Sequence, residues 1–163
     1  LESASTEVWA VEKEADPFAL ACRNRDLLAA RGVHLERADA TQDATLSHLD
    51  GMVDIIVTNP PYVPLDEMPT QPEASAAPHV ALYGGSPDGT EIPVRIMRRA
   101  LTLLRPGGTL LMEHSPSQES LLRDHASAAG FVDVSTLPDL TGRPRFLRAR
   151  APQSTKPTTS VTQ

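Results

Sequence analysis

The sequence predicts an α/β fold built on a mostly parallel sheet of the nucleotide-binding kind. Two observations lead to this prediction. β-favouring segments flank a helical segment early in the chain, and acidic residues, Glu12 and Asp39, stand where two of these strands end. Further along, the apolar strand at residues 54–57 runs directly into an Asn-Pro-Pro-Tyr turn at residues 59–62. Because ligands bind at the carboxyl ends of strands in open α/β sheets, the functional residues are expected there.

The composition excludes several classes of protein. The chain of 163 residues suffices for one domain, and its hydrophobic and charged fractions of 40% and 22% are typical of a globular protein. The formal net charge of −6 disfavours sequence-independent binding of nucleic acid. A local basic patch is still possible, because four arginines cluster near the end of the chain: Arg143, Arg145, Arg148 and Arg150. The single cysteine, Cys22, excludes an internal disulfide, and no apolar run approaches a membrane span, so we expect a cytoplasmic protein without membrane contact.

The first half of the chain is expected to hold strands at residues 7–12, 33–38 and 52–57, with a short helix near Leu46. Between the first two strands, Asp16 and Pro17 predict the start of a helix, as a capping carboxylate and a first-turn proline. Gly32 predicts where this helix stops. The apolar positions that fit one face of it are Phe18, Leu20, Ala21, Leu27 and Leu28.

The second half begins with a long, proline-rich loop after Tyr62, a type of segment that often serves in binding. The later elements are expected as a helix at 91–104, a strand at 109–113, a helix at 117–129, and an antiparallel pair at 131–137 and 146–149. Residues 105–108 and Gly130 are expected to end the two helices. From Ala151 onward the chain is rich in Pro, Ser, Thr and Gln, which predicts a disordered tail.

The Asn-Pro-Pro-Tyr turn has a structural and a chemical interpretation. A stiff turn between strand and loop would explain Pro60 and Pro61, but it would not explain Asn59. In the chemical interpretation, the turn binds a substrate that has a planar amide or ring amino nitrogen. Such a nitrogen is a poor nucleophile because its lone pair is delocalised. The side-chain oxygen of Asn59 and the carbonyl of Pro60 could accept its N–H groups and orient it, while Tyr62 offers a flat face for packing.

Several motifs together resemble the release factor glutamine methyltransferases, a family of Rossmann-like enzymes that depend on S-adenosylmethionine. The resemblance runs from about Val8 to Arg150. The motifs that carry it are the turn at 59–62, the Ala-Leu-Tyr-Gly-Gly-Ser-Pro-Asp-Gly loop at 81–89, the Leu-Leu-Met-Glu-His strand end at 110–114, and an Asp-x-x-Gly-x-x-Arg pattern formed by Asp139, Gly142 and Arg145.

The resemblance implies a role for each matching position. The catalytic residues would be Asn59, Pro60, Pro61 and Tyr62, which in the family hold the glutamine amide of the Gly-Gly-Gln motif of peptide chain release factors. Glu12 would bind the ribose hydroxyls of S-adenosylmethionine, Asp39 and Ala40 would flank its adenine, and Asn59 would lie near both cofactor and substrate. No metal is expected, and the release factor would be the protein partner.

The sequence departs from the family in two places. The family's first strand and its Gly-rich cofactor loop have no counterpart, since no glycine precedes Gly32, so residues 1–150 look like an amino-terminally truncated catalytic domain followed by a tail at 151–163. In the family that strand lies at the centre of the sheet, and its loss would leave unpaired backbone groups there. We therefore expect this polypeptide alone to bind S-adenosylmethionine poorly, and micromolar binding in calorimetry would contradict this expectation. In addition, Ala77-Pro78 stands where the family has Glu-Pro.

Three rival interpretations remain open at this stage. Adenine-N6 methyltransferases of DNA and glutamine methyltransferases of ribosomal proteins share the same turn and chemistry. A non-catalytic remnant that binds a partner through the long loop is the rival of a different class. Glu113 and His114 could polarise the site, or they could simply form a polar strand end.

Overall fold

The computed structural model describes residues 6–64 and 83–153. The chain divides into two compact units, residues 1–48 and 49–163, and each unit is described by itself. The described strands form two separate sheets, one of two strands in the first unit and one of four strands in the second. No helix within the described ranges is long and apolar enough to cross a membrane.

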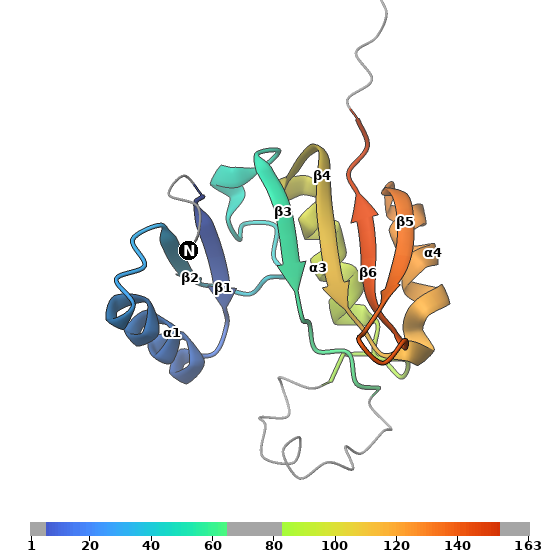
Figure 1. Ribbon diagram of the computed structural model, residues 1–163, viewed down its shortest axis with the longest axis horizontal. Coiled ribbons are helices and arrows are strands. Elements are labelled where there is room, and N and C mark those ends of the chain that lie inside the picture. Colours follow the sequence, from blue (N-terminus) through green and yellow to red (C-terminus); the bar gives the residue numbers. More distant parts are fainter. Residues whose placement is uncertain (1–5, 65–82, 154–163) are drawn as a thin grey trace, which may run out of the picture. The chain divides into compact units, whose positions relative to one another are not determined.

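The first unit is a β-α-β element (Figure 1). Strands β1 (Val8–Glu12) and β2 (Val33–Arg37) pair in parallel, with Val8 opposite Val33 and Glu12 opposite Arg37. Helix α1 (Ala15–Leu27) connects them. The parallel register brings the carboxyl ends of both strands to one edge, as the sequence predicted.

Helix α1 differs from the prediction in how it begins and ends. Its N-cap is Glu14, in extended conformation, and the Glu14 N–H donates to Oε1 of Glu12 (2.8 Å), whereas Asp16 lies inside the first turn. The residue in left-handed conformation after the end of α1 is Ala29, at φ 48°, rather than Gly32. The predicted apolar face of α1 is also not buried, since Leu20, Leu27 and Leu28 are exposed.

The second unit is a four-stranded sheet in the order β3-β4-β6-β5 (Figure 1). Its strands are β3 (Val53–Thr58), β4 (Leu104–Glu113), β5 (Val132–Pro138) and β6 (Pro144–Arg150). β3 and β4 are parallel, but β6 is antiparallel to both β4 and β5. β5 therefore runs in the same direction as β3 and β4, and β6 is the reversed strand among the four described strands. The sheet is mixed, with the antiparallel closing hairpin that the sequence predicted.

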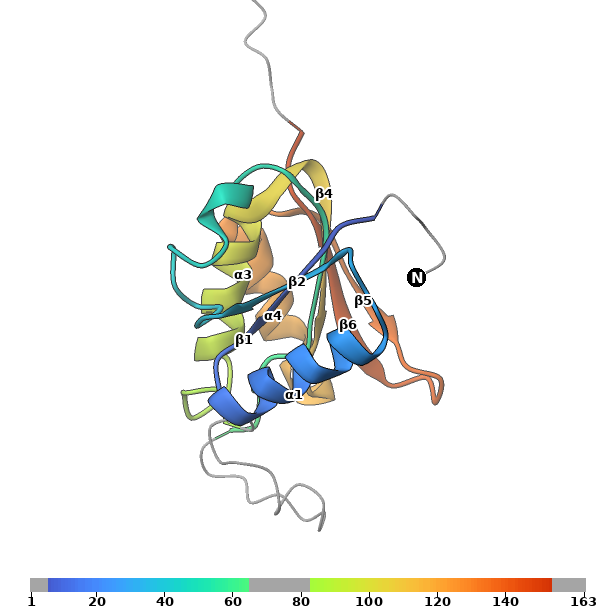
Figure 2. The same cartoon turned by 90° about the vertical axis from the view of Figure 1, so that its left-hand side faces the viewer.

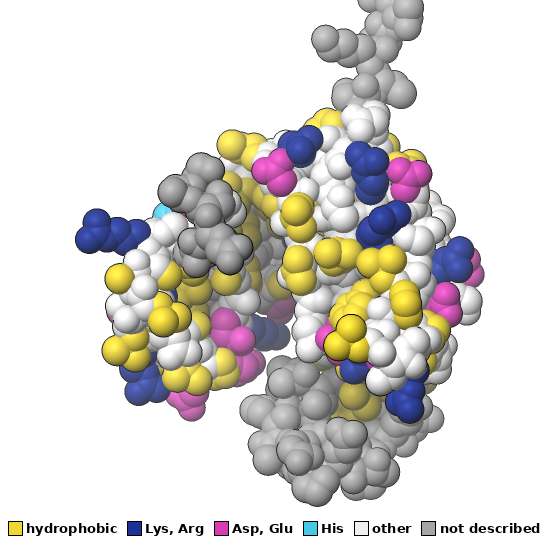
Figure 3. Space-filling model, in the orientation of Figure 1, with side chains coloured by type: hydrophobic (Ala, Val, Ile, Leu, Met, Phe, Trp, Pro, Cys, Tyr) yellow, Lys and Arg dark blue, Asp and Glu magenta, His cyan; other side chains and the backbone are white. Residues whose placement is uncertain are grey.

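Helices α3 (Glu91–Leu103) and α4 (Glu119–Ala129) cover one face of this sheet, and short 3₁₀ helices occur at Ser47–Leu49 and Pro116–Gln118 (Figure 2). The core lies beneath these helices. Its fully buried side chains include Met97, Leu110, Met112, Leu122 and Leu147. On the opposite face hydrophobic side chains gather in the open (Figure 3), among them Ile55 and Val57, which are 62% and 75% exposed.

Two boundaries of the second unit differ from the prediction. Strand β4 begins at Leu104 instead of residue 109, because residues 105–108 form an irregularity inside it: Leu104 pairs with Val53, and the next pair is Thr109 with Ile55. Ala151 belongs to the core rather than to a tail. It is 4% exposed, and its backbone N–H donates to the carbonyl of Gly108 (2.9 Å). Residues 154–163 lie outside the described residues.

The core position of Leu147 allows a stability prediction. Leu147 is completely buried between the hairpin and the helices, so Leu147→Ala is expected to lower the free energy of unfolding by about 3 kcal/mol. Leu140, at the tip of the same hairpin, is fully exposed, so Leu140→Ala should change it by less than about 0.5 kcal/mol. Urea unfolding of both variants measures the difference, and equal effects would contradict the assignment of the core.

Candidate functional site

The predicted turn at residues 59–62 leaves the carboxyl end of β3, beside the end of β4. Asn59 is exposed, whereas Pro60 is buried and anchors the turn. Neither the Asn59 carboxamide nor the Pro60 carbonyl has a hydrogen-bond partner among the described residues. Both oxygens are therefore available as acceptors, at the edge of the sheet where ligands are expected.

Tyr62 belongs to a compact polar network. The guanidinium of Arg145 donates through Nη2 to Oε1 of Glu113 (2.8 Å) and to the Tyr62 hydroxyl (3.0 Å), and this hydroxyl donates to Oε1 of Glu113 (3.2 Å). The Arg145 Cζ atom lies 5.6 Å from the centre of the Tyr62 ring. Burial is the largest cause that raises the pKa of Tyr62 above its ordinary value, so the phenol stays protonated at neutral pH.

A buried amide ties the turn to the next loop. Gln118, only 3% exposed, donates through Nε2 to the carbonyls of Tyr62 (2.8 Å) and Asp88 (2.7 Å), and its Oε1 accepts the N–H of Ser115 (3.1 Å). Tyr62 and Asp88 flank the long loop of the sequence. Gln118 thus fixes the carboxyl end of the turn against the segment that returns from that loop.

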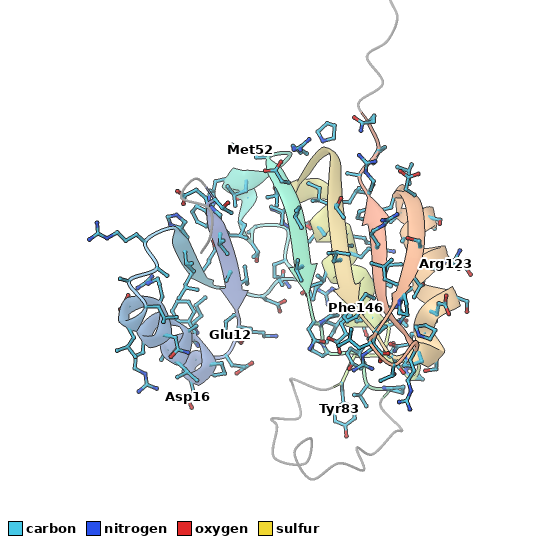
Figure 4. All side chains as sticks on the ribbon, viewed as in Figure 1. Glu12, Asp16, Met52, Tyr83, Arg123 and Phe146 are labelled. Atoms are coloured by element: carbon cyan, nitrogen blue, oxygen red, sulfur yellow. The ribbon has the colours of Figure 1, made fainter. Side chains whose placement is uncertain are left out.

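A hollow of about 370 Å³ adjoins the turn on the open face of the sheet. Its lining is Val57, Thr58, Asn59, Leu111, Glu113, Leu137 and Phe146. Phe146 lies where β6 begins, next to the end of β4 (Figure 4). Most of the lining side chains are apolar, and Thr58, Asn59 and Glu113 add a few polar groups, a composition typical of ligand sites.

The first unit holds the other predicted residues. Glu12 ends β1 (Figure 4), and its backbone carbonyl accepts the N–H of Ala38, so the segment after β2 is attached to the end of β1. Asp39 is the centre of a tight turn: Oδ1 accepts the N–H and the hydroxyl of Thr41 (2.9 and 2.7 Å), and Oδ2 contacts Nζ of Lys13 (3.0 Å). Ala40 lies inside this turn.

The Asp39 turn leads to a pH prediction. The hydrogen bond from the Thr41 hydroxyl, followed by that from the Thr41 N–H and the contact with Lys13, lowers the pKa of Asp39 from 3.8 to about 2. Because the pKa of Asp39 is lower in the folded than in the unfolded chain, its ionised carboxylate stabilises the fold at pH values above the unfolded-state pKa. This contribution is lost as the pH falls through the folded-state pKa. The stability difference between wild type and Asp39→Asn should therefore shrink from pH 4 to pH 2, in unfolding curves recorded at each pH. A difference that stays constant over this window would contradict the prediction.

The predicted residues thus fall into two groups, Glu12 with Asp39 and Ala40 in the first unit, and residues 59–62 in the second. Sequence reasoning missed Gln118 completely, because a glutamine at a helix start carries no local signal of its buried contacts. It noted Arg145 only as part of a motif and of a basic cluster, and it left Glu113 undecided between two roles. Both side chains contact Tyr62.

Comparison with known proteins gives a consistent result in sequence and in fold. No family model matches the chain. The release factor glutamine methyltransferase of Bifidobacterium longum is 50% identical over 155 residues, covering 91% of this chain and 53% of that protein. The enzyme of the same name from Mycobacterium tuberculosis is 45% identical over 123 residues, covering 74% of this chain and 40% of that protein.

Solved structures show the same fold at low sequence identity. A methyltransferase from Pyrococcus furiosus gives a TM-score of 0.65 at 21% identity, covering 90% of this chain and 63% of that one. TrmN from Thermus thermophilus gives a TM-score of 0.56 at 19% identity, covering 91% and 37%. The chain spans about half the length of the curated relatives it matches. Over the residues it contains, it belongs to the release factor glutamine methyltransferase family.

Proposed function

We propose that the protein transfers a methyl group from S-adenosylmethionine to the side-chain amide nitrogen of a glutamine in a peptide chain release factor, in the cytoplasm. The observation that carries the proposal is the Asn59 turn. In a chain 50% identical to a release factor glutamine methyltransferase, it presents at the end of a strand two acceptors that have no partner within residues 6–64 and 83–153. This arrangement suits a substrate that has two N–H groups on one planar nitrogen.

The residues of the turn would orient the substrate. The Asn59 side-chain oxygen and the Pro60 carbonyl would each accept one N–H of the glutamine amide, so that its lone pair points toward the methyl group. Tyr62 would pack its ring on the plane of the amide. When bound, S-adenosylmethionine would supply the methyl group of its sulfonium. The amide nitrogen would bond to the methyl carbon in line as the bond from that carbon to sulfur breaks. The nitrogen would then lose one proton to water.

The first unit offers residues that fit the adenosine part of this cofactor. The Glu12 carboxylate is held by the Glu14 N–H through one oxygen, and a carboxylate has acceptor capacity left for two ribose hydroxyls. Both oxygens of Asp39 are engaged by Thr41 and Lys13. Asp39 would therefore shape the turn that brings Ala40 to the adenine, rather than bind the cofactor itself.

The test uses the product of the complete reading frame that encodes this chain. We expect it to add one methyl group to a Gly-Gly-Gln glutamine of a release factor, as measured by mass spectrometry of the tryptic peptide. DNA rich in adenine and a ribosomal-protein fraction serve as competing substrates, because they represent the two rival chemistries. Methylation of either of these, with the release factor unmodified, would overturn the proposal.

A further inference from the structure

We infer that Arg145 and Glu113 are positioning residues that fix the ring of Tyr62 at the edge of the site. This inference deepens the proposed function and rests on it for its catalytic consequence, because Tyr62 is the residue that would pack on the substrate amide. The contacts are direct. One Arg145 nitrogen donates to both the Glu113 carboxylate and the Tyr62 hydroxyl, and that hydroxyl donates to the same carboxylate oxygen.

The three hydrogen bonds leave the Tyr62 ring little freedom. A phenol that only accepts or only donates one bond can still rotate about that bond. The Tyr62 hydroxyl does both, toward two partners that are themselves joined at 2.8 Å. The side chains of Arg145 and Glu113 are only 32% and 23% exposed. Because water competes less for such groups, this pair is held more firmly than an exposed ion pair would be.

The shape of the β5–β6 hairpin explains how Arg145 reaches the turn. At the hairpin tip, Oδ1 of Asp139 accepts the Thr141 N–H (2.7 Å), the Thr141 hydroxyl (2.7 Å) and the Arg143 N–H (3.0 Å). Gly142 follows at φ 82°, a left-handed conformation that favours glycine. The hairpin therefore closes tightly, and β6 starts in a fixed register with Phe146 opposite Glu113. Arg145 is the residue before Phe146, beside the end of β4.

The Asp-x-x-Gly-x-x-Arg pattern thus gains a physical interpretation. Its first two members, Asp139 and Gly142, build the turn of the hairpin. Its third member, Arg145, uses that turn to contact a residue 83 positions earlier in the chain. The pattern and the Asn-Pro-Pro-Tyr turn would then act together, and both would position the Tyr62 ring where the substrate amide binds.

The first test follows the phenol of Tyr62 by NMR of protein labelled with ¹³C at the tyrosine rings. The chain contains two tyrosines, so Tyr83 is an internal reference and Tyr62→Phe assigns the signal. Arg145→Met removes a cation that stabilises the phenolate form of Tyr62, so it should raise the pKa of Tyr62. Glu113→Gln removes an anion that destabilises the phenolate, so it should lower this pKa. The control is Arg148→Met, an exposed position on the same strand, which should leave the titration unchanged.

The second test measures methyl transfer to a release factor by the product of the complete reading frame. Arg145→Met is expected to lower kcat about 10-fold with little change in the KM for S-adenosylmethionine, since only the orientation of the substrate is affected. In a Tyr62→Phe background the same substitution should have less than about a 2-fold effect, because the shared hydroxyl is already gone. Arg145→Lys, which keeps the charge, should restore part of kcat.

The two tests separate the inference from the proposed function. If the wild-type product does not methylate the release factor, the proposed function is wrong, while the phenol titrations still decide whether Arg145 and Glu113 hold Tyr62. Identical titration of Tyr62 in wild type, Arg145→Met and Glu113→Gln would overturn the inference. So would fully additive losses of kcat in the double variant of Arg145 and Tyr62.

Discussion

Replacing Asn59 by alanine is expected to lower kcat for glutamine methylation about 100-fold or more, because the variant loses an acceptor that orients the nucleophile. Asn59 is exposed at the end of β3, and its carboxamide has no partner among the described residues. Asn59→Ala should therefore change the free energy of unfolding by less than about 0.5 kcal/mol. Methyl transfer and urea unfolding, measured on the same preparation, separate a catalytic loss from a loss of fold.

A second variant at this position distinguishes orientation from mere proximity. Asn59→Asp keeps a side-chain oxygen that can accept an N–H, so it should retain more activity than Asn59→Ala, although its added charge weakens binding of an uncharged amide. Equal losses in both variants would indicate that the donor half of the carboxamide matters instead. Wild-type activity of Asn59→Ala would overturn the assigned role of the turn and, with it, the proposed function.

The second large effect is expected at Gly89, where the returning loop meets the turn. A Cβ atom on Gly89 would overlap the carbonyl oxygen of Tyr62 and lie 2.9 Å from Nε2 of Gln118. Gly89 also has φ +70°, which strains any other residue. Gly89→Ala should lower the free energy of unfolding by about 3 kcal/mol, from strain and clash together. Because the clash falls on the turn, methyl transfer should decrease as well.

Gly51 is a matched control for this prediction. Its φ of +71° is nearly that of Gly89, but a Cβ atom there would have nothing within 4 Å. Gly51→Ala should therefore cost only the backbone strain, about 1 kcal/mol, and should leave methyl transfer unchanged. Denaturant unfolding of both variants isolates the clash as the difference between them. Equal destabilisation at the two positions would show that Gly89 does not pack against the turn as described.

The sequence alone was sufficient for what depends on near neighbours in the chain. Strands β1, β2 and β3, helices α3 and α4, and the closing hairpin were all predicted close to their observed bounds. Their patterns of apolar residues, prolines and glycines act through local backbone geometry. The Asn-Pro-Pro-Tyr turn was found for the same reason, since a strand followed by that tetrapeptide is contiguous in the chain.

Errors arose where a local signal competed with a contact further away. Gly32 looked like the end of α1, but Ala29 takes the left-handed conformation instead. The Arg-Pro-Gly-Gly segment at 105–108 looked like an interruption before β4. Pairing of Leu104 with Val53 draws the segment into the strand, because the sheet compensates for its unfavourable propensity.

What surrounds the turn was decided only by the tertiary structure. Glu113 and Arg145 stand 51 and 83 residues after Tyr62, and they meet it because β3, β4 and β6 are neighbours in one sheet with fixed registers. A register shift of one residue in β6 would turn the Arg145 side chain to the other face. The sequence therefore determined which residues form the turn. Only the pairing of the strands, a property of the whole sheet, determined which side chains hold that turn in place.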